Sequence, residues 1–220
     1  PNHRWPMSWI YRREGQRLLA YERAVAAEAR RSFFVTPAEV ALFTGQAPEA
    51  AERVQAVGNG VDSAYFAPDA ARANPFAADE QAIVFTGAMD YWPNVDAVTW
   101  FAQDVLPALR QRWPAARLHV VGRSPTPAVL ALAGPHVHVT GTVPDVRPYL
   151  QHAAAVVAPL RVARGIQNKI LEAMAMGQPV VTVSGCADVI AEPGQGGLLR
   201  ADDPAAMVTA VDGLLADRTR

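Results

Sequence analysis

Cysteine occurs only once among the 220 residues of this sequence, as Cys186. One thiol excludes an internal disulfide framework and any metal site built from several cysteines. The histidines offer no substitute, since His136 and His138 share one strand face without a Cys or Glu partner at metal-ligand spacing. We therefore expect no metal site built from these side chains, and a reducing compartment such as the cytoplasm.

Long hydrophobic runs are also lacking: no stretch approaches the ~18 apolar residues that a membrane span requires. The sequence begins at Pro1 with neither an initiator methionine nor the pattern of a signal peptide. We interpret both ends as cuts within a longer protein.

The sequence has no excess of charge of either sign, with 20 Lys and Arg against 21 Asp and Glu. Without a global positive field, nucleic acid is not an expected partner, and a small ligand is the better hypothesis. The Gly-x-Gly-x-x-Gly turn of dinucleotide-binding folds is missing too, and the stretch nearest to it, residues 121–125, fails the pattern. An NAD-dependent oxidoreductase therefore ranks low.

Half of the residues are hydrophobic, and beyond residue 80 short β-rich apolar runs alternate with helical stretches. The six runs are Ala82–Phe85, Arg117–Val121, Val137–Val139, Ala155–Val157, Val180–Val183 and Gly197–Leu199. Buried strands separated by helices predict an α/β fold with a doubly wound parallel sheet. The longest helix is predicted from about Asn94 to Arg112, ended by Pro114.

The first 65 residues follow a different pattern. A long amphipathic helix is predicted around Trp9–Arg30, followed by a short apolar run and by a capping box with proline at Thr36–Glu39. A Pro- and Ala-rich stretch then extends to Ala78. We expect residues 1–65 to be the remnant of an N-terminal domain with its linker, and residues 66–220 to form a second domain.

Open parallel sheets bind ligands beyond the carboxyl ends of their strands, so the loops after the first four runs should line one cleft. The most informative stretch, residues 164–181, follows the fourth run. Gly165 opens a helix there, so the amide groups of residues 165–168 and the positive end of the helix dipole would face the cleft and bind a diphosphate. Lys169 adds a positive charge, and Glu172, one turn later, could accept hydrogen bonds from a ribose.

At this stretch the sequence resembles the group 1 (family four) glycosyltransferases of GT-B fold. Glu172 followed by Gly177-x-Pro179-Val180-Val181 carries the resemblance most clearly. It continues through Asn59-Gly60-Val61-Asp62, Phe66-x-Pro68, Gly87, Val121-Gly122 and Gly141-x-Val143-x-Asp145, and covers most of residues 31–215. The order and spacing of these separate pieces make the match specific. The variant Gly-Ile-Gln-Asn-Lys is similar to transferases of bacterial exopolysaccharide or exosortase systems.

The resemblance implies a retaining transfer of a hexose-type sugar from a nucleoside diphosphate to a saccharide or lipid-linked acceptor. We expect this transfer to need no metal and no other cofactor, since the nucleoside-diphosphate sugar is a substrate. It assigns the donor to the second domain and the acceptor to the N-terminal domain, so this chain alone is not expected to complete a transfer. The catalytic residues would be Arg164, Lys169 and Glu172. Donor contacts would come from Gly87, Arg123, Gly141, Val143, Arg161, Gly165, Ile166, Gln167 and Asn168.

Two departures from the family pattern affect this assignment. Arg164 occupies the position of the family's first glutamate, which leaves the identity of the sugar open. The Arg and Lys pair that usually follows the first strand of this domain is replaced by Met89–Asn94. Lys169, with Arg164, Arg161 or Arg123, must then stabilise the leaving group.

Other hypotheses remain open from the sequence. A sugar-nucleotide 2-epimerase shares the architecture but needs carboxylate and histidine pairs that we cannot place, and a non-catalytic sugar-nucleotide-binding module would follow if Arg164 abolished turnover. The opening helix, with seven Arg against three Glu in residues 1–31, either packs on another domain or contacts an anionic membrane or a lipid-linked acceptor. The second option would place the protein peripherally at the inner membrane.

Overall fold

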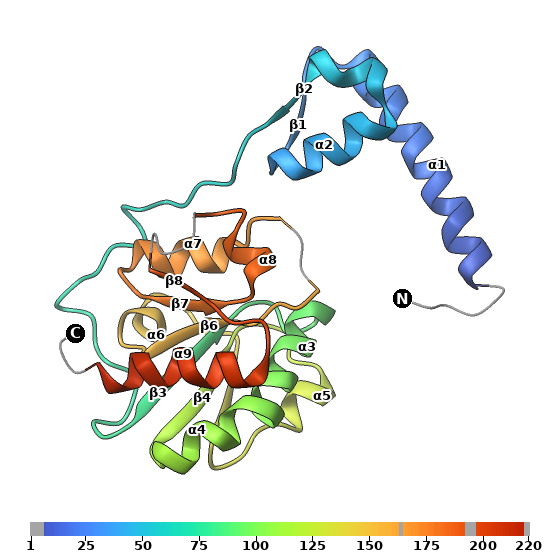
Figure 1. Ribbon diagram of the computed structural model, residues 1–220. Coiled ribbons are helices and arrows are strands. Elements are labelled where there is room, and N and C mark those ends of the chain that lie inside the picture. The colour runs from blue at the N-terminus through green and yellow to red at the C-terminus, as the bar shows by residue number, and fades with distance from the viewer. Residues whose placement is uncertain (1–6, 163–164, 192–196, 218–220) are drawn as a thin grey trace. The chain divides into compact units, whose positions relative to one another are not determined.

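The computed structural model describes residues 7–162, 165–191 and 197–217. Contacts between residues divide the chain into two compact units, Pro1–Asn59 and Gly60–Arg220, and each is described by itself (Figure 1). Arg164 lies outside the described residues, so the structure gives no information on its predicted role.

The first unit joins three helices to a two-stranded parallel sheet. The helices are α1 (Met7–Glu28), α2 (Pro37–Gln46) and the 3-10 helix η1 (Pro48–Arg53), and the strands are β1 (Ser32–Phe34) and β2 (Val54–Ala56). Its core is small, comprising Ala26, Phe43, Ala47, Ala50 and Val54. Most of α1 is exposed within the described residues, including Trp9 and Tyr21.

The capping box predicted at the start of α2 is confirmed. The Glu39 amide donates to Thr36 Oγ1 at 3.1 Å, and the Thr36 amide donates to Glu39 Oε2 at 2.9 Å. Two amides that the helix leaves unpaired are thereby satisfied, and Pro37 needs no such partner.

The second unit is a six-stranded parallel sheet with the order β5-β4-β3-β6-β7-β8. The strands are β3 (Gln81–Thr86), β4 (Ala116–Val121), β5 (Val137–Gly141), β6 (Ala155–Ala158), β7 (Val180–Thr182) and β8 (Leu198–Arg200). Each coincides with one of the predicted runs to within two residues at either end. The predicted doubly wound α/β fold is confirmed.

Helices cover both faces of this sheet (Figure 1). One face carries α3 (Trp92–Trp100), η2 (Phe101–Val105), α4 (Leu106–Arg112) and α9 (Pro204–Ala216), which contact one another. The other helices are α5 (Pro127–Leu130), α6 (Arg147–Gln151), α7 (Asn168–Ala175) and α8 (Ser184–Ala187), and α7 contacts β6 and β7. In Figure 1, α6 and α7 lie across the sheet from α4 and α9.

The predicted helix 94–112 forms, but with a π-helical segment in its middle, η2. Pro107 follows directly, and a proline has no amide to donate to the carbonyl four residues earlier. The widened turn accommodates that missing bond. The apolar periodicity revealed the helix, and the interruption comes from Pro107.

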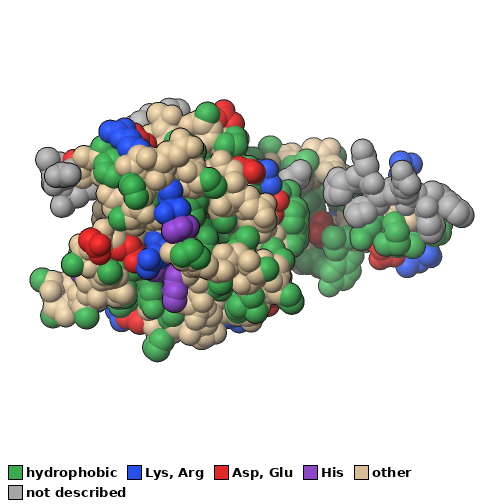
Figure 2. Space-filling model, turned by 90° about the horizontal axis from the view of Figure 1, so that it is seen from below, with side chains coloured by type: hydrophobic (Ala, Val, Ile, Leu, Met, Phe, Trp, Pro, Cys, Tyr) green, Lys and Arg blue, Asp and Glu red, His purple; other side chains and the backbone are tan. Residues whose placement is uncertain are grey.

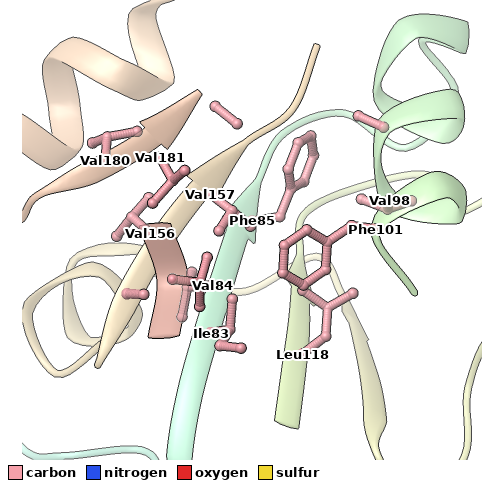
Figure 3. Close-up of a cluster of buried hydrophobic side chains, with 14 of the residues drawn as sticks. Ile83, Val84, Phe85, Val98, Phe101, Leu118, Val156, Val157, Val180 and Val181 are labelled. Carbon is pink, nitrogen blue, oxygen red and sulfur yellow. The ribbon is translucent and has the colours of Figure 1, made fainter. Parts of the chain in front are cut away.

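The core of the second unit is made of aliphatic and aromatic side chains from the sheet and from the helices on it. Figure 3 shows Val84 and Val156 in the sheet, and Phe101 of η2 packed beside Leu118 of β4. These strand residues are at most 3% exposed. Both faces of the sheet are therefore covered, which is why its strands read as continuous apolar runs.

Residues 60–80 belong to the second unit, although we expected the boundary between residues 65 and 66. The Arg147 guanidinium lies 3.9 Å from the Tyr65 ring centroid and donates to the Tyr65 carbonyl at 3.1 Å. Asp145 pairs with Arg147 at 2.8 Å, which lowers the pKa of that carboxyl. The Asp of the predicted Gly-x-Val-x-Asp motif thus fixes the segment that enters the sheet.

Two glycines allow the loops after β3 and β4 to touch. Gly122 has φ +150°, and a Cβ built on it would lie 1.7 Å from the Gly87 carbonyl oxygen. The Gly87 amide also donates to the Val121 carbonyl at 3.0 Å. No side chain fits between these two backbones.

Gly122→Ala should lower the free energy of unfolding by about 2–4 kcal/mol, because the added methyl group clashes with backbone in a conformation unfavourable for alanine. Chemical denaturation of the whole chain measures it. Gly185→Ala is the control, since a Cβ there meets nothing within 4 Å. Equal stability of the two variants would contradict the close approach.

Candidate functional site

The site lies where the sheet reverses its winding direction. From β3 the chain moves to β4 and β5 on one side, whereas β6 lies on the other side of β3 and continues to β7 and β8. The loops after β3 and β6 therefore leave in opposite directions, and such switch points are where open α/β sheets bind ligands. Gly87 and α3 follow β3, and Gly165 and α7 follow β6.

Lys169 of α7 contacts residues of β3 and α3 on the other side of the switch point. It is the only lysine in the 220-residue sequence. Its Nζ atom donates to Oδ1 of Asn94, in the first turn of α3, at 2.6 Å. The same Nζ lies 4.1 Å from the centroid of the Phe85 ring on β3.

The buried surroundings of Lys169 disfavour the charged form of its side chain. Burial lowers the pKa of the ammonium to about 7, and the neighbouring Glu172 and Cys186 partly oppose that shift. The ring face of Phe85 attracts a cation but replaces little of its lost hydration. A bound anion would restore the favourable interaction that water no longer provides.

Glu172 lies three positions after Lys169 on α7, and its side chain is half-buried. Burial raises the pKa of its carboxyl, and the charge of Lys169 opposes that shift. Among the residues that the structure describes, none donates a hydrogen bond to this carboxylate. The arrangement offers hydroxyl donors an acceptor within one helical turn of a cation.

The helix α7 begins at Asn168, three residues after Gly165, where we expected it to open. Gly165 has φ +74°, a conformation that favours glycine, and the N-cap residue Gln167 makes no side-chain cap hydrogen bond to the helix. Ile166 and Gln167 are partly exposed, and Asn168 is exposed. The first turn of α7 is therefore not capped by its own N-cap side chain, and its dipole favours a negative ligand.

The loops after β4 and β5 reach the same edge of the sheet. The Gly122 amide donates to the Gly141 carbonyl at 3.2 Å, and the Met89 amide donates to the Arg123 carbonyl at 2.8 Å. The Arg123 side chain is exposed, whereas Val143 packs partly against the core. Backbone hydrogen bonds thus join the loops that carry Gly87, Arg123 and Gly141.

Arg161 differs from the other cations predicted for the site. Its guanidinium forms two hydrogen bonds with the Asp96 carboxylate, at 2.7 and 3.2 Å, and lies 5.2 Å from the Trp100 ring centroid. These contacts tie the loop after β6 to α3. If Arg161 also bound the donor, its guanidinium would have to interact with the donor and with Asp96 at the same time.

Sequence reasoning missed Asn94 and Phe85 as parts of the site. The sequence pattern marks Asn94 as the start of a helix and as the end of the segment that replaces the family's Arg and Lys pair, and it marks Phe85 as a strand residue. Asn94 carried a usable signal, because a polar residue at the start of the helix that follows a buried strand lies near the edge of the sheet where ligands bind. Its contact with Lys169 spans 75 positions in sequence and could not be read from local pattern.

The remaining polar groups do not form a second centre of this kind. His119 is buried, with its Nε2 atom against Glu80 and its ring 4.6 Å from Phe76, and burial lowers its pKa. The described residues contain no group of three or more His, Cys, Asp or Glu able to hold a metal ion. They also contain no helix long and apolar enough to cross a membrane. Basic and acidic side chains are interspersed on the face shown in Figure 2.

Comparison with protein families decides the assignment. The family model described as "Glycosyl transferases group 1" matches residues 80–217. The chain belongs to the group 1 glycosyltransferases. The matched residues include all six strands of the large sheet and the whole of the site described above.

Several solved structures have the same fold. HepE of Anabaena, solved with UDP and glucose, is 17% identical with a TM-score of 0.69, over 90% of this chain and 57% of that one. A glycosyltransferase of Rickettsia africae is 14% identical with a TM-score of 0.69, over 90% and 56%. Sucrose-phosphate synthase of Thermosynechococcus elongatus is 22% identical with a TM-score of 0.68, over 90% and 52%.

This chain therefore spans little more than half the length of these three proteins. A comparison with curated proteins found no match.

The pKa of Lys169 can be measured without ambiguity in this glycosyltransferase chain. Selective ¹³C labelling of lysine should give signals from a single side chain. We expect their titration midpoint at about 7, because burial lowers the pKa of the amine. Loss of the signal in Lys169→Met confirms its origin. A midpoint near the ordinary value of 10.5 would show that the amine is hydrated.

Proposed function

We propose that this chain provides the donor site of a glycosyltransferase that moves a hexose-type sugar from a nucleoside diphosphate to a saccharide or lipid-linked acceptor. The single observation that carries the proposal is the placement of Lys169 and Glu172, one helical turn apart, at the switch point of a sheet that belongs to this family. Exopolysaccharide or cell-envelope glycan synthesis is the setting we favour. The acceptor site and the complete transfer belong to the longer architecture of the relatives.

Leaving-group stabilisation is the chemical demand that this site meets. When the bond between sugar and diphosphate breaks, negative charge grows on the phosphate oxygens, and fixed donors there stabilise the transition state more than the ground state. The Lys169 ammonium and the first-turn amides of α7 are such donors. Because they are held by the fold, they need little reorganisation during the reaction, and no step requires a metal ion.

Glu172 and the loop after β5 would hold the nucleoside. A carboxylate that accepts from both ribose hydroxyls satisfies its own half-buried oxygens, and the backbone near Val143 would receive the base. Gly87 and Gly141 leave room for close approach of the donor. HepE, a protein of the same fold, has been solved with UDP-glucose, which makes UDP a reasonable first probe.

Lys169→Met should weaken binding of UDP-glucose by about tenfold or more, the loss expected for one charge-assisted hydrogen bond. The advantage of the wild-type chain should be largest below pH 7, where the free amine is already charged, and should shrink as the pH rises through the pKa of Lys169. Calorimetry between pH 6 and pH 9 measures it.

Arg112→Met is the matched control for this loss, because it removes an exposed cation at the far end of α4. An identical affinity loss in both variants, or an advantage of the wild-type chain that does not change with pH, would refute the assigned role of Lys169.

Glu172→Leu should remove discrimination between UDP and 2′-deoxy-UDP. The wild-type chain is expected to prefer UDP by about tenfold, because a carboxylate left without its hydroxyl donor loses the stabilisation of that bond. In the variant, both nucleotides should bind equally. Asp104→Asn, which removes an exposed charge from η2, should keep the preference. Retention of the preference in Glu172→Leu would place the ribose elsewhere.

A further inference from the structure

Asn94 is a buried polar residue with two defined hydrogen bonds. It is 5% exposed, accepts from Lys169 Nζ at 2.6 Å through Oδ1, and donates to the Ala88 carbonyl at 2.8 Å through Nδ2. An ammonium only donates and a carbonyl only accepts, so chemistry alone fixes which way the amide points. The side chain therefore connects the loop after β3 to α7 in one orientation.

Gly87 makes this contact sterically possible. A Cβ built on Gly87 would lie 2.8 Å from Asn94 Nδ2 and 2.9 Å from Lys169 Nζ, closer than carbon atoms approach such groups. The ammonium and the amide thus occupy the space that any other residue would fill. The Phe85 ring lies against the same ammonium.

The groups around Lys169 leave Asn94 as its only hydrogen-bond acceptor among the described residues. The titratable groups that act on it are Glu172 from its own helix and Cys186 from α8, and neither accepts a hydrogen bond from its Nζ atom in this arrangement. An ammonium has three donors, so one bond to Asn94 leaves donors for a ligand. The neutral amide orients the cation without neutralising it.

A carboxylate in the place of Asn94 would behave differently. An aspartate would form a partly buried ion pair with Lys169 and compete with the phosphate oxygens of a ligand. An apolar residue would leave the ammonium without an acceptor. An amide is the side chain of this size that holds the cation and keeps its charge available.

We propose that Asn94 is the positioning residue for the diphosphate-binding cation of this site, fixing the Lys169 ammonium between α3 and α7 through a neutral hydrogen bond. This inference rests on the proposed function for its ligand, whereas the positioning itself does not depend on any ligand. Asn94 acts through Lys169, and its own contact with a donor is not required.

The test compares Asn94→Asp with Asn94→Leu in the whole chain, with lysine carbon resonances as the readout. Asn94→Asp should raise the pKa of Lys169 well above about 7, because it supplies an opposite charge, and Asn94→Leu should lower it, because it removes the acceptor. Both should weaken UDP binding by about tenfold. Asn74→Asp, on an exposed turn, should change neither quantity.

A merely structural role predicts another outcome. If Asn94 only stabilised the start of α3, both variants would lower the unfolding temperature and leave the pKa of Lys169 unchanged or moved in the same direction, and the proposal would be overturned. If the variants fail to fold, the wild-type chain still decides, since the Asn94 side-chain amide resonance should titrate with the same midpoint as Lys169. Different midpoints would refute the contact.

The measurement of UDP binding distinguishes this inference from the proposed function. If the wild-type chain does not bind UDP while the two Asn94 variants shift the pKa of Lys169 in opposite directions, the positioning holds and the donor assignment fails. If UDP binds and the variants leave the pKa unmoved, the donor assignment holds and the positioning fails.

Discussion

The site depends on one constraint, the burial of a positively charged amine at the point where the sheet reverses its winding. Lys169 reaches this position from α7 and is held against the Phe85 ring by the Asn94 amide. Its neighbours can be this close because Gly87 and Gly122 carry no side chains. The chain's only lysine therefore sits where burial disfavours its charge and an anionic ligand would restore it.

The geometry also bears on how the proposed donor site would function without the Arg and Lys pair that the resemblance led us to expect after the first strand of this domain. In this chain the segment after β3 contributes Asn94, which accepts a hydrogen bond. The cation is Lys169, which comes from α7 on the opposite side of the switch point. Arg161 is engaged by Asp96, and Arg123 is exposed. Among the described cations predicted for the site, Lys169 is the one that is not exposed, so its charge state would respond to binding of the proposed donor.

Local pattern predicted the strands well because each is buried on both faces and reads as an apolar run, and it predicted α2 because its capping box is a local device. It located Lys169 and Glu172 because both follow a recognisable glycine in one short stretch. It could not find the contact between Lys169 and Asn94, because the parallel pairing of β3 with β6 brings these distant segments together. It also missed the π-helical segment before Pro107, since periodicity does not register a missing amide.

The most direct test of this account is the pKa of Lys169 with and without bound UDP, read from the single labelled lysine of the chain. If the ammonium holds the diphosphate, saturating UDP must raise that pKa by the same free energy with which the charge favours the nucleotide. We predict a clear upward shift from about 7. Saturation of the chain with UDP and an unchanged pKa would contradict the account.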